Sequence, residues 1–133
     1  MILVDTSVWI DYLNGKESSL TNILDKALID GSVAIGDLIL LEILQGIKAE
    51  REYSKTRTAL ATLDLYEMFG HHMVEKCVEN FRFLRKKGIT IRKTNEVIIA
   101  TFCIVNNLPL LFSNRDFIPF VDHLGLIPVS LKT

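Results

Sequence analysis

The 133-residue chain has little of what marks several specialised protein classes. Its two cysteines are too few for a disulfide-stabilised scaffold or for a four-cysteine zinc site. No apolar run approaches the ~20 residues that a membrane-spanning helix needs. Hydrophobic residues make up 49% and charged residues 23% of the chain, a balance typical of a globular protein. The length predicts one domain, residues 1–133, around a single hydrophobic core.

The first residues also lack the pattern of a secretory signal. Met1 is followed at once by the apolar Ile2-Leu3-Val4, with no basic segment and no cleavage signal, so we expect a cytoplasmic protein. The formal net charge of −1 favours no class of partner. The position of the charges along the chain is more informative.

Short apolar segments alternate with helical patterns. Strands are predicted at 2–4, 33–35, 108–112 and 127–131, and residues 65–69 form a strand or a turn. Helices are predicted over 8–13, from the N-cap candidates Ser18 and Ser19 to Gly31, from an Asp37 N-cap to Gly46, over 50–63 and 72–87, and over 95–105 after a Thr94 cap. The 72–87 helix is expected to bury one face, formed by Val74, Cys77, Val78, Phe81 and Leu84. The alternation predicts an α/β fold with a mostly parallel central sheet.

Four acidic residues occupy positions that such a sheet brings together. Asp5 and Asp116 each follow a predicted strand, and ligand sites in parallel sheets form beyond the carboxyl ends of strands. Glu42 lies in an apolar helix, and Glu96 lies in the first turn of another helix. Each acid alone also fits an ordinary role: a cap, an exposed helix flank, a favourable dipole contact or a turn. Carboxylates crowded at one point repel one another unless a hard cation such as Mg²⁺ or Mn²⁺ lies between them. Together they predict metal-assisted phosphodiester hydrolysis.

Four segments then carry a family resemblance over nearly the whole chain. They are Ile-Leu-Val-Asp-Thr-Ser-Val-Trp-Ile-Asp at 2–11, Leu-Glu-Ile-Leu-Gln-Gly at 41–46, the stretch from Phe83 to Ala100, and Asn-Leu-Pro-Leu-Leu at 107–111 with Arg-Asp-Phe at 115–117. In this order they resemble the PIN-domain ribonucleases, specifically the VapC toxins of bacterial toxin–antitoxin pairs. The resemblance implies a PIN domain, a Rossmann-like three-layer α/β/α fold.

The resemblance also implies roles for individual residues. The family's acids fall on Asp5, Glu42, Glu96 and Asp116, which would be the catalytic residues and the ligands of Mg²⁺ or Mn²⁺. Thr6, Ser7 and Asn114 would support this site. The sequence departs from the family at two positions, since Glu96 stands where Asp is usual and Asn114 where a further Asp is frequent. Glu adds a methylene, and Asn offers a carbonyl oxygen without charge.

A basic segment leads directly into Glu96. Its Lys and Arg side chains can bind the phosphate backbone of RNA, although a cluster of like charges is also typical of a solvent-exposed helix face. The predicted RNA contacts are Arg82, Arg85, Lys86, Lys87, Arg92 and Lys93, with Arg115 near the site. A second group, formed by Lys48, Arg51, Lys55 and Arg57, is mixed with acids and is interpreted as an exposed helix surface.

The resemblance implies a Mg²⁺-dependent endoribonuclease toxin that inhibits translation by cleaving RNA, with transfer RNA the first substrate to consider. It further implies a VapB-type antitoxin partner and a homodimer. Two alternatives stay open. The departures at 96 and 114 fit a weakened PIN module that binds RNA or an antitoxin without cleaving. Asp5 could instead act as a phosphoacceptor on a Rossmann-like sheet.

Overall fold

The structure, a computed structural model, describes residues 1–129 and has a parallel sheet at its centre. The strands are β1 (Ile2–Val4), β2 (Val33–Gly36), β3 (Asp64–Tyr66) and β4 (Leu110–Leu111), in the spatial order β3-β2-β1-β4. Every pairing is parallel, and Leu3 lies opposite both Ala34 and Leu110. Strands β1, β2 and β4 are short, apolar and largely buried, as expected of strands covered on both faces.

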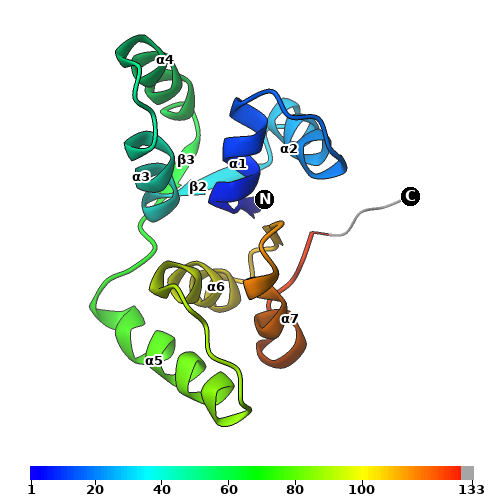
Figure 1. The fold of residues 1–133 in the computed structure, drawn as a ribbon, viewed down its shortest axis with the longest axis vertical. Helices are drawn as coiled ribbons and strands as arrows, with labels where there is room; N and C mark the ends of the chain where they lie inside the picture. The colour runs from blue at the N-terminus through cyan, green and yellow to red at the C-terminus, as the bar shows by residue number, and fades with distance from the viewer. Residues whose placement is uncertain (130–133) are drawn as a thin grey trace.

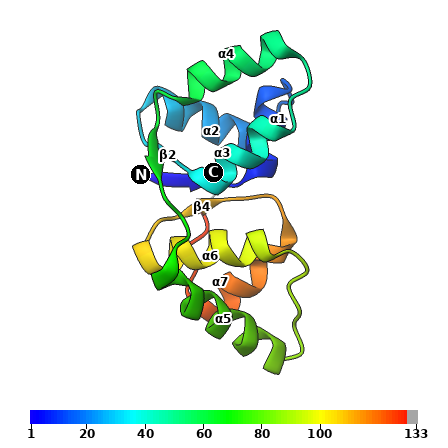
Figure 2. The ribbon, with the colours of Figure 1, turned by 90° about the vertical axis from the view of Figure 1, so that its left-hand side faces the viewer.

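Helices cover both faces of this sheet. They are α1 (Thr6–Leu13), α2 (Ser19–Ile29), α3 (Asp37–Gln45), α4 (Glu50–Leu60), α5 (His71–Lys86), α6 (Thr94–Asn106) and α7 (Ile118–Leu124), with a 3-10 turn η1 at Arg115–Phe117. Figures 1 and 2 show α1 to α4 on one side of the sheet and α5 to α7 on the other. This arrangement confirms the predicted three-layer α/β/α fold. Within the described residues no helix is long and apolar enough to cross a membrane.

The helix boundaries confirm one predicted cap and correct two others. Ser18 accepts a hydrogen bond from the backbone N–H of Thr21, and Thr21 accepts one from that of Ser18, a reciprocal capping box at the start of α2. Asp37 and Thr94 are instead the first residues of α3 and α6, after Gly36 and Lys93. The Asp37 carboxylate accepts from the backbone N–H groups of Leu38 and Met68, which joins the start of α3 to the segment after β3.

Two further predictions about packing need correction. In α5 the buried residues are Met73, Cys77 and Leu84, whereas Val74 and Val78 are 42% and 50% exposed. The buried stripe is thus rotated, because α5 packs mainly against α6 and meets α7 as well. Of the predicted last strand, residues 130 and 131 lie outside the described part, and Pro128 forms only an isolated parallel bridge with Leu110.

The parallel topology places the carboxyl ends of the strands at one edge of the sheet. In Figure 2, β1 ends on the side where α6 begins and where α5 ends. The backbone N–H of Asp5 donates to the carbonyl of Leu111 at 2.9 Å, so the residues following β1 and β4 are adjacent. This edge is where the sequence predicts the functional site.

Candidate active site at the carboxyl edge of the sheet

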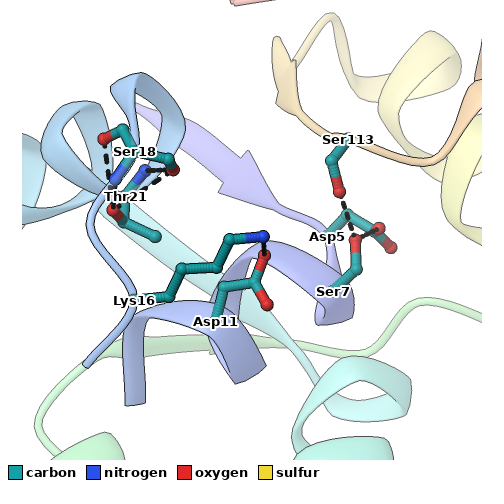
Figure 3. A network of polar contacts seen from close by, with 7 residues as sticks. All are labelled: Asp5, Ser7, Asp11, Lys16, Ser18, Thr21 and Ser113. Atoms are coloured by element: carbon teal, nitrogen blue, oxygen red, sulfur yellow. Dashed lines mark hydrogen bonds and ion pairs between the residues drawn. The ribbon is translucent and has the colours of Figure 1, made fainter. Parts of the chain in front are cut away.

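Asp5 is a buried acid whose place at the site follows directly from the strand order. Its side chain is only 5% exposed, and its Oδ2 accepts a hydrogen bond from the Ser7 hydroxyl at 2.7 Å. The same hydroxyl lies 3.0 Å from that of Ser113, in the loop after β4 (Figure 3). Ser7, predicted as a supporting residue, thereby connects the carboxylate beyond β1 to the loop after the neighbouring strand.

Glu42 reaches the same edge from α3, and its carboxylate is held on both sides. Oε1 accepts from the Thr6 hydroxyl at 2.6 Å, and Oε2 accepts from the side-chain amide of Asn95 at 3.0 Å. The Glu42 carboxylate therefore has hydrogen-bond partners although its sequence neighbours are apolar, because α1 and α6 each supply a donor. Thr6, predicted as a supporting residue, contacts Glu42 through this hydrogen bond.

Glu96 lies in the first turn of α6 and is 5% exposed. Its Oε2 accepts from the side-chain amide of Asn114, in the loop that precedes η1. Its other oxygen, Oε1, is fully buried and has no hydrogen-bond partner among residues 1–129. A buried carboxylate oxygen without a donor is costly, so a positive group beside this atom would stabilise the ionised form of Glu96.

Asp116 is linked to the other acids through Asn114. The backbone N–H of Asp116 donates to Oδ1 of Asn114 at 2.9 Å. Its carboxylate lies 3.7 Å from the guanidinium of Arg92, a side chain that is 84% exposed. Arg92, a predicted RNA contact, is therefore beside a predicted metal ligand, in a pair too exposed to hold either group firmly.

Asp5 and Glu96, the two buried acids, have raised pKa values. Burial raises the pKa of Asp5, the hydrogen bond from Ser7 opposes this, and the charge of Glu42 adds to the increase. Burial also raises the pKa of Glu96, as do the charges of Asp116 and Asp5. The charge of Glu42 thus acts on Asp5, and the charges of Asp5 and Asp116 act on Glu96. Each of the two buried acids is destabilised in its ionised form.

The donor set fits a hard divalent cation. Repelling carboxylates and a buried oxygen without a donor are both stabilised by a positive ion between them. Nevertheless, among residues 1–129 no three His, Cys, Asp or Glu side chains converge closely enough to form a ready metal site. The acids are thus brought to one edge without being gathered at one point, and metal binding stays a prediction.

The predicted basic side chains are all exposed, so they are available to a partner. Arg82, Arg85 and Lys86 lie towards the end of α5, and Lys87, Arg92 and Lys93 lie between α5 and α6. Two of them rest on aromatic rings of α5: Arg85 lies 5.5 Å from the centre of Phe81, and Lys87 lies 5.2 Å from that of Phe83. Arg115 is in η1, next to Asp116.

Two site residues were not predicted. Asn95 donates to Glu42, and Ser113 contacts Ser7. A weak signal existed for each, since Asn95 precedes Glu96 at a helix start and Ser113 follows a predicted strand. The two cysteines are buried as expected, and burial raises the pKa of Cys103 to about 12, which excludes a thiolate nucleophile there.

The profile of the PIN domain family matches residues 2–120. This is most of the chain, and the chain belongs to the PIN domain family. Among its relatives, ribonuclease VapC11 of Mycobacterium tuberculosis is 24% identical over 119 residues, which cover 88% of this chain and 89% of the relative. The predicted resemblance to VapC proteins is therefore confirmed.

Solved structures show the same fold. A chain in the crystal structure of VapBC2 from Rickettsia felis, bound to a DNA fragment from its promoter, matches with a TM-score of 0.76 and 24% identity. That match covers 97% of this chain and 98% of the other. DNA-bound VapBC from Salmonella typhimurium matches with a TM-score of 0.75 and 16% identity, over 99% and 100% of the two chains.

Proposed function

We propose that this PIN domain is a metal-dependent endoribonuclease and the toxin of a toxin–antitoxin pair. The observation that carries the proposal is that two buried carboxylates at this edge of the sheet repel each other. Asp5 and Glu96 are both 5% exposed, and the charge of Asp5 raises the pKa of Glu96. Glu96 also has a buried oxygen without a donor in residues 1–129. A fold tolerates such a cost where function requires it. The VapC relatives are ribonucleases by name, which supports RNA as the substrate.

Asp5, Glu42, Glu96 and Asp116 would hold Mg²⁺ or Mn²⁺. When bound, a divalent cation neutralises charge on the phosphodiester and promotes the ionisation of water. Ser7 and Thr6 orient Asp5 and Glu42, so that these carboxylates need not reorganise when the cation enters. Asp5 and Glu96 form the most buried part of the site and would exclude water from one side of the ion.

The basic side chains near α6 would bind the RNA backbone. Arg115 lies next to Asp116, so it would contact a phosphate close to the reacting bond. The exposed cations of α5 and of the following segment would contact phosphates further along the strand. Transfer RNA is the first substrate that we would test.

The proposed partners are a VapB-type antitoxin and a second copy of the chain. The similar solved structures are VapBC complexes, which supports an antitoxin. A toxin of this kind would act on RNA in the cytoplasm and inhibit translation.

The test is cleavage of total bacterial RNA by the antitoxin-free chain with Mg²⁺, with Mn²⁺ and with EDTA. We expect discrete fragments that require the metal and that disappear in Asp5→Asn. The matched control is Asp30→Asn, which makes the same change at an exposed acid after α2 and should leave cleavage unchanged. The fragment ends would identify the target.

A folded chain that cleaves no RNA with either metal would overturn the nuclease proposal. Binding of RNA that persists in EDTA without any product would then favour the weakened PIN module, which the departures at Glu96 and Asn114 motivate. Incorporation of a phosphoryl group from acetyl phosphate, measured by intact mass, would favour the phosphoacceptor.

A further inference from the structure

The two positions where the sequence departs from the family's acidic pattern contact each other directly. Glu96 is in the first turn of α6 and Asn114 is in the loop between β4 and η1, and the amide of Asn114 donates to Oε2 of Glu96. The longer acid and the uncharged amide are therefore joined in one hydrogen bond. This contact gives Asn114 a role different from the carbonyl ligand that its side chain could otherwise be.

The orientation of the Asn114 amide is fixed by its second hydrogen bond. Oδ1 accepts from the backbone N–H of Asp116 at 2.9 Å, so the NH₂ group must face Glu96. A reversed amide would place N–H against N–H and oxygen against carboxylate, and both hydrogen bonds would be broken. Asn114 consequently has its oxygen occupied by the backbone and its nitrogen occupied by the acid.

We propose that Asn114 is a positioning residue for Glu96, and that its amide holds Oε2 so that Oε1 alone is left for a cation. Oε1 is buried and lacks a donor within the described residues, as expected of an atom that ligates a cation once one binds. Glu96 and Asn114 are then energetically coupled: Glu96 carries the negative charge, and Asn114 donates a hydrogen bond to it. The assignment of Oε1 rests on the proposed function, whereas the coupling of the two side chains does not.

The proposal predicts a specific result in a double-mutant cycle on the metal-free protein. Asn114→Asp keeps an oxygen for the Asp116 N–H but replaces the donor facing Glu96 with a second carboxylate. It should lower the melting temperature by about 5–10 °C at pH 7, since it removes a charge-assisted hydrogen bond and adds repulsion at a buried site. In a Glu96→Gln background the same change should cost little, because the amide introduced at position 96 can donate to the carboxylate introduced at position 114.

Asn22→Asp is the matched control for this cycle. Asn22 is an exposed residue of α2, so the identical chemical change there should shift the melting temperature equally in both backgrounds. If Asn114→Asp does not fold, Asn114→Ala replaces it, and its destabilising effect should likewise be smaller in Glu96→Gln than in the native background. Additive effects at 96 and 114 would overturn the proposal.

Cation binding gives the second readout. Isothermal titration of the chain with Mn²⁺ should show affinity about 10–100-fold weaker in Asn114→Ala, the usual effect of removing a group that orients a metal ligand. Unchanged Mn²⁺ affinity would contradict the assignment of Oε1. Weakened affinity together with additive stabilities would make Asn114 a direct ligand, which also overturns the positioning role. Neither readout uses RNA, so a failure of the nuclease proposal is seen separately.

Discussion

The carboxylates of the site differ in how fully their neighbours satisfy them. Glu42 accepts a donor at each oxygen, from Thr6 and Asn95. Glu96 has a donor at Oε2 alone, within the part of the chain described, whereas Asp5 has the Ser7 hydroxyl at Oδ2 and is also stabilised by the backbone N–H groups of Thr6 and Ser7. A cation entering the site would therefore relieve most repulsion at Asp5 and Glu96. At these two residues the fold tolerates buried negative charge.

The burial of the Asp5 carboxylate predicts the effect of Asp5→Asn on stability. The pKa of Asp5 is raised by burial, so the native state holds its proton more tightly than the unfolded chain. Stability is therefore lost as the pH rises through the native pKa, and the ionised carboxylate destabilises the fold at pH 7. Asn keeps the acceptor for Ser7 without the charge. We expect a melting temperature higher by about 3–5 °C at pH 7, corresponding to ~1 kcal/mol in a chain of this size.

The measurement is thermal unfolding in EDTA between pH 4 and pH 7. The advantage of Asp5→Asn should shrink towards the acidic end, where native Asp5 becomes protonated. Asp30→Asn, at an exposed position, should show no such pH-dependent gain. Adding Mn²⁺ should stabilise the native chain more than the variant. A variant that is less stable than the native chain at pH 7 would contradict this account.

At the scale of elements, the junction between β2 and α3 sets the direction in which Glu42 approaches the site. Gly36 ends β2 and caps α3 at an ordinary φ of −90°, so backbone strain does not require glycine there. A Cβ on Gly36 would instead overlap the sulfur of Met68, a fully buried side chain after β3. A side chain at position 36 would therefore force the buried Met68 side chain to move.

Gly36→Ala is expected to destabilise the protein by about 1–3 kcal/mol through overpacking. Met68→Ala should itself cost about 2–5 kcal/mol through a cavity. The double variant should cost clearly less than the sum, because the shortened side chain leaves room for the new methyl. Urea unfolding measures all three free energies. Gly46→Ala is the control, since its Cβ would meet only backbone oxygens at 3.6 Å. Equal destabilisation by the changes at Gly36 and Gly46 would refute the packing argument.

Element identities could be predicted from the sequence more readily than the faces they bury. The strands at 2–4 and 33–35 are continuous apolar segments, and the Ser18 cap involves only residues 18 and 21, so both features can be predicted from the local sequence. The rotated face of α5 was not, because Val74 and Met73 are both apolar and only packing against α6 selects between them. Helix starts at Asp37 and Thr94 were displaced by one residue, since Gly36 and Lys93 cap without side-chain bonds.

The same division applies to the site. The sequence indicated Asp5, Glu42, Glu96 and Asp116 because acids that follow strands or lie near helix ends can meet at one edge of a parallel sheet. The partners of these acids depend on contacts between segments 18 to 53 residues apart in the chain, such as Asn114 with Glu96 and Asn95 with Glu42. No local pattern encodes such pairs. The sequence thus predicted the acids and three supporting side chains, and the structure shows which donor meets which acid.

For the molecule as a whole, the distribution of charge matters more than its sum. The net charge is −1, yet residues 80–95 carry six cations and no acid. In Figure 2 the end of α5 lies on the same side as the start of α6, and the segment between them carries Arg92, which lies 3.7 Å from Asp116. An RNA strand entering the site would replace counterions along this surface. Binding should therefore weaken steeply with salt, and these positions should set the slope.

The final prediction concerns that slope, measured by RNA binding of the uncleaving Asp5→Asn chain at several salt concentrations. Neutralising Lys86 and Lys87 to Gln should weaken binding and reduce the magnitude of the slope by about 1 for each phosphate that the variant no longer binds. The matched control neutralises Lys48 and Lys55, two exposed lysines near and within α4, on the opposite side of the sheet. That control should leave the slope unchanged. Equal effects of the two pairs would mean that RNA senses only net charge, and that the basic segment beside Glu96 is an ordinary solvated surface.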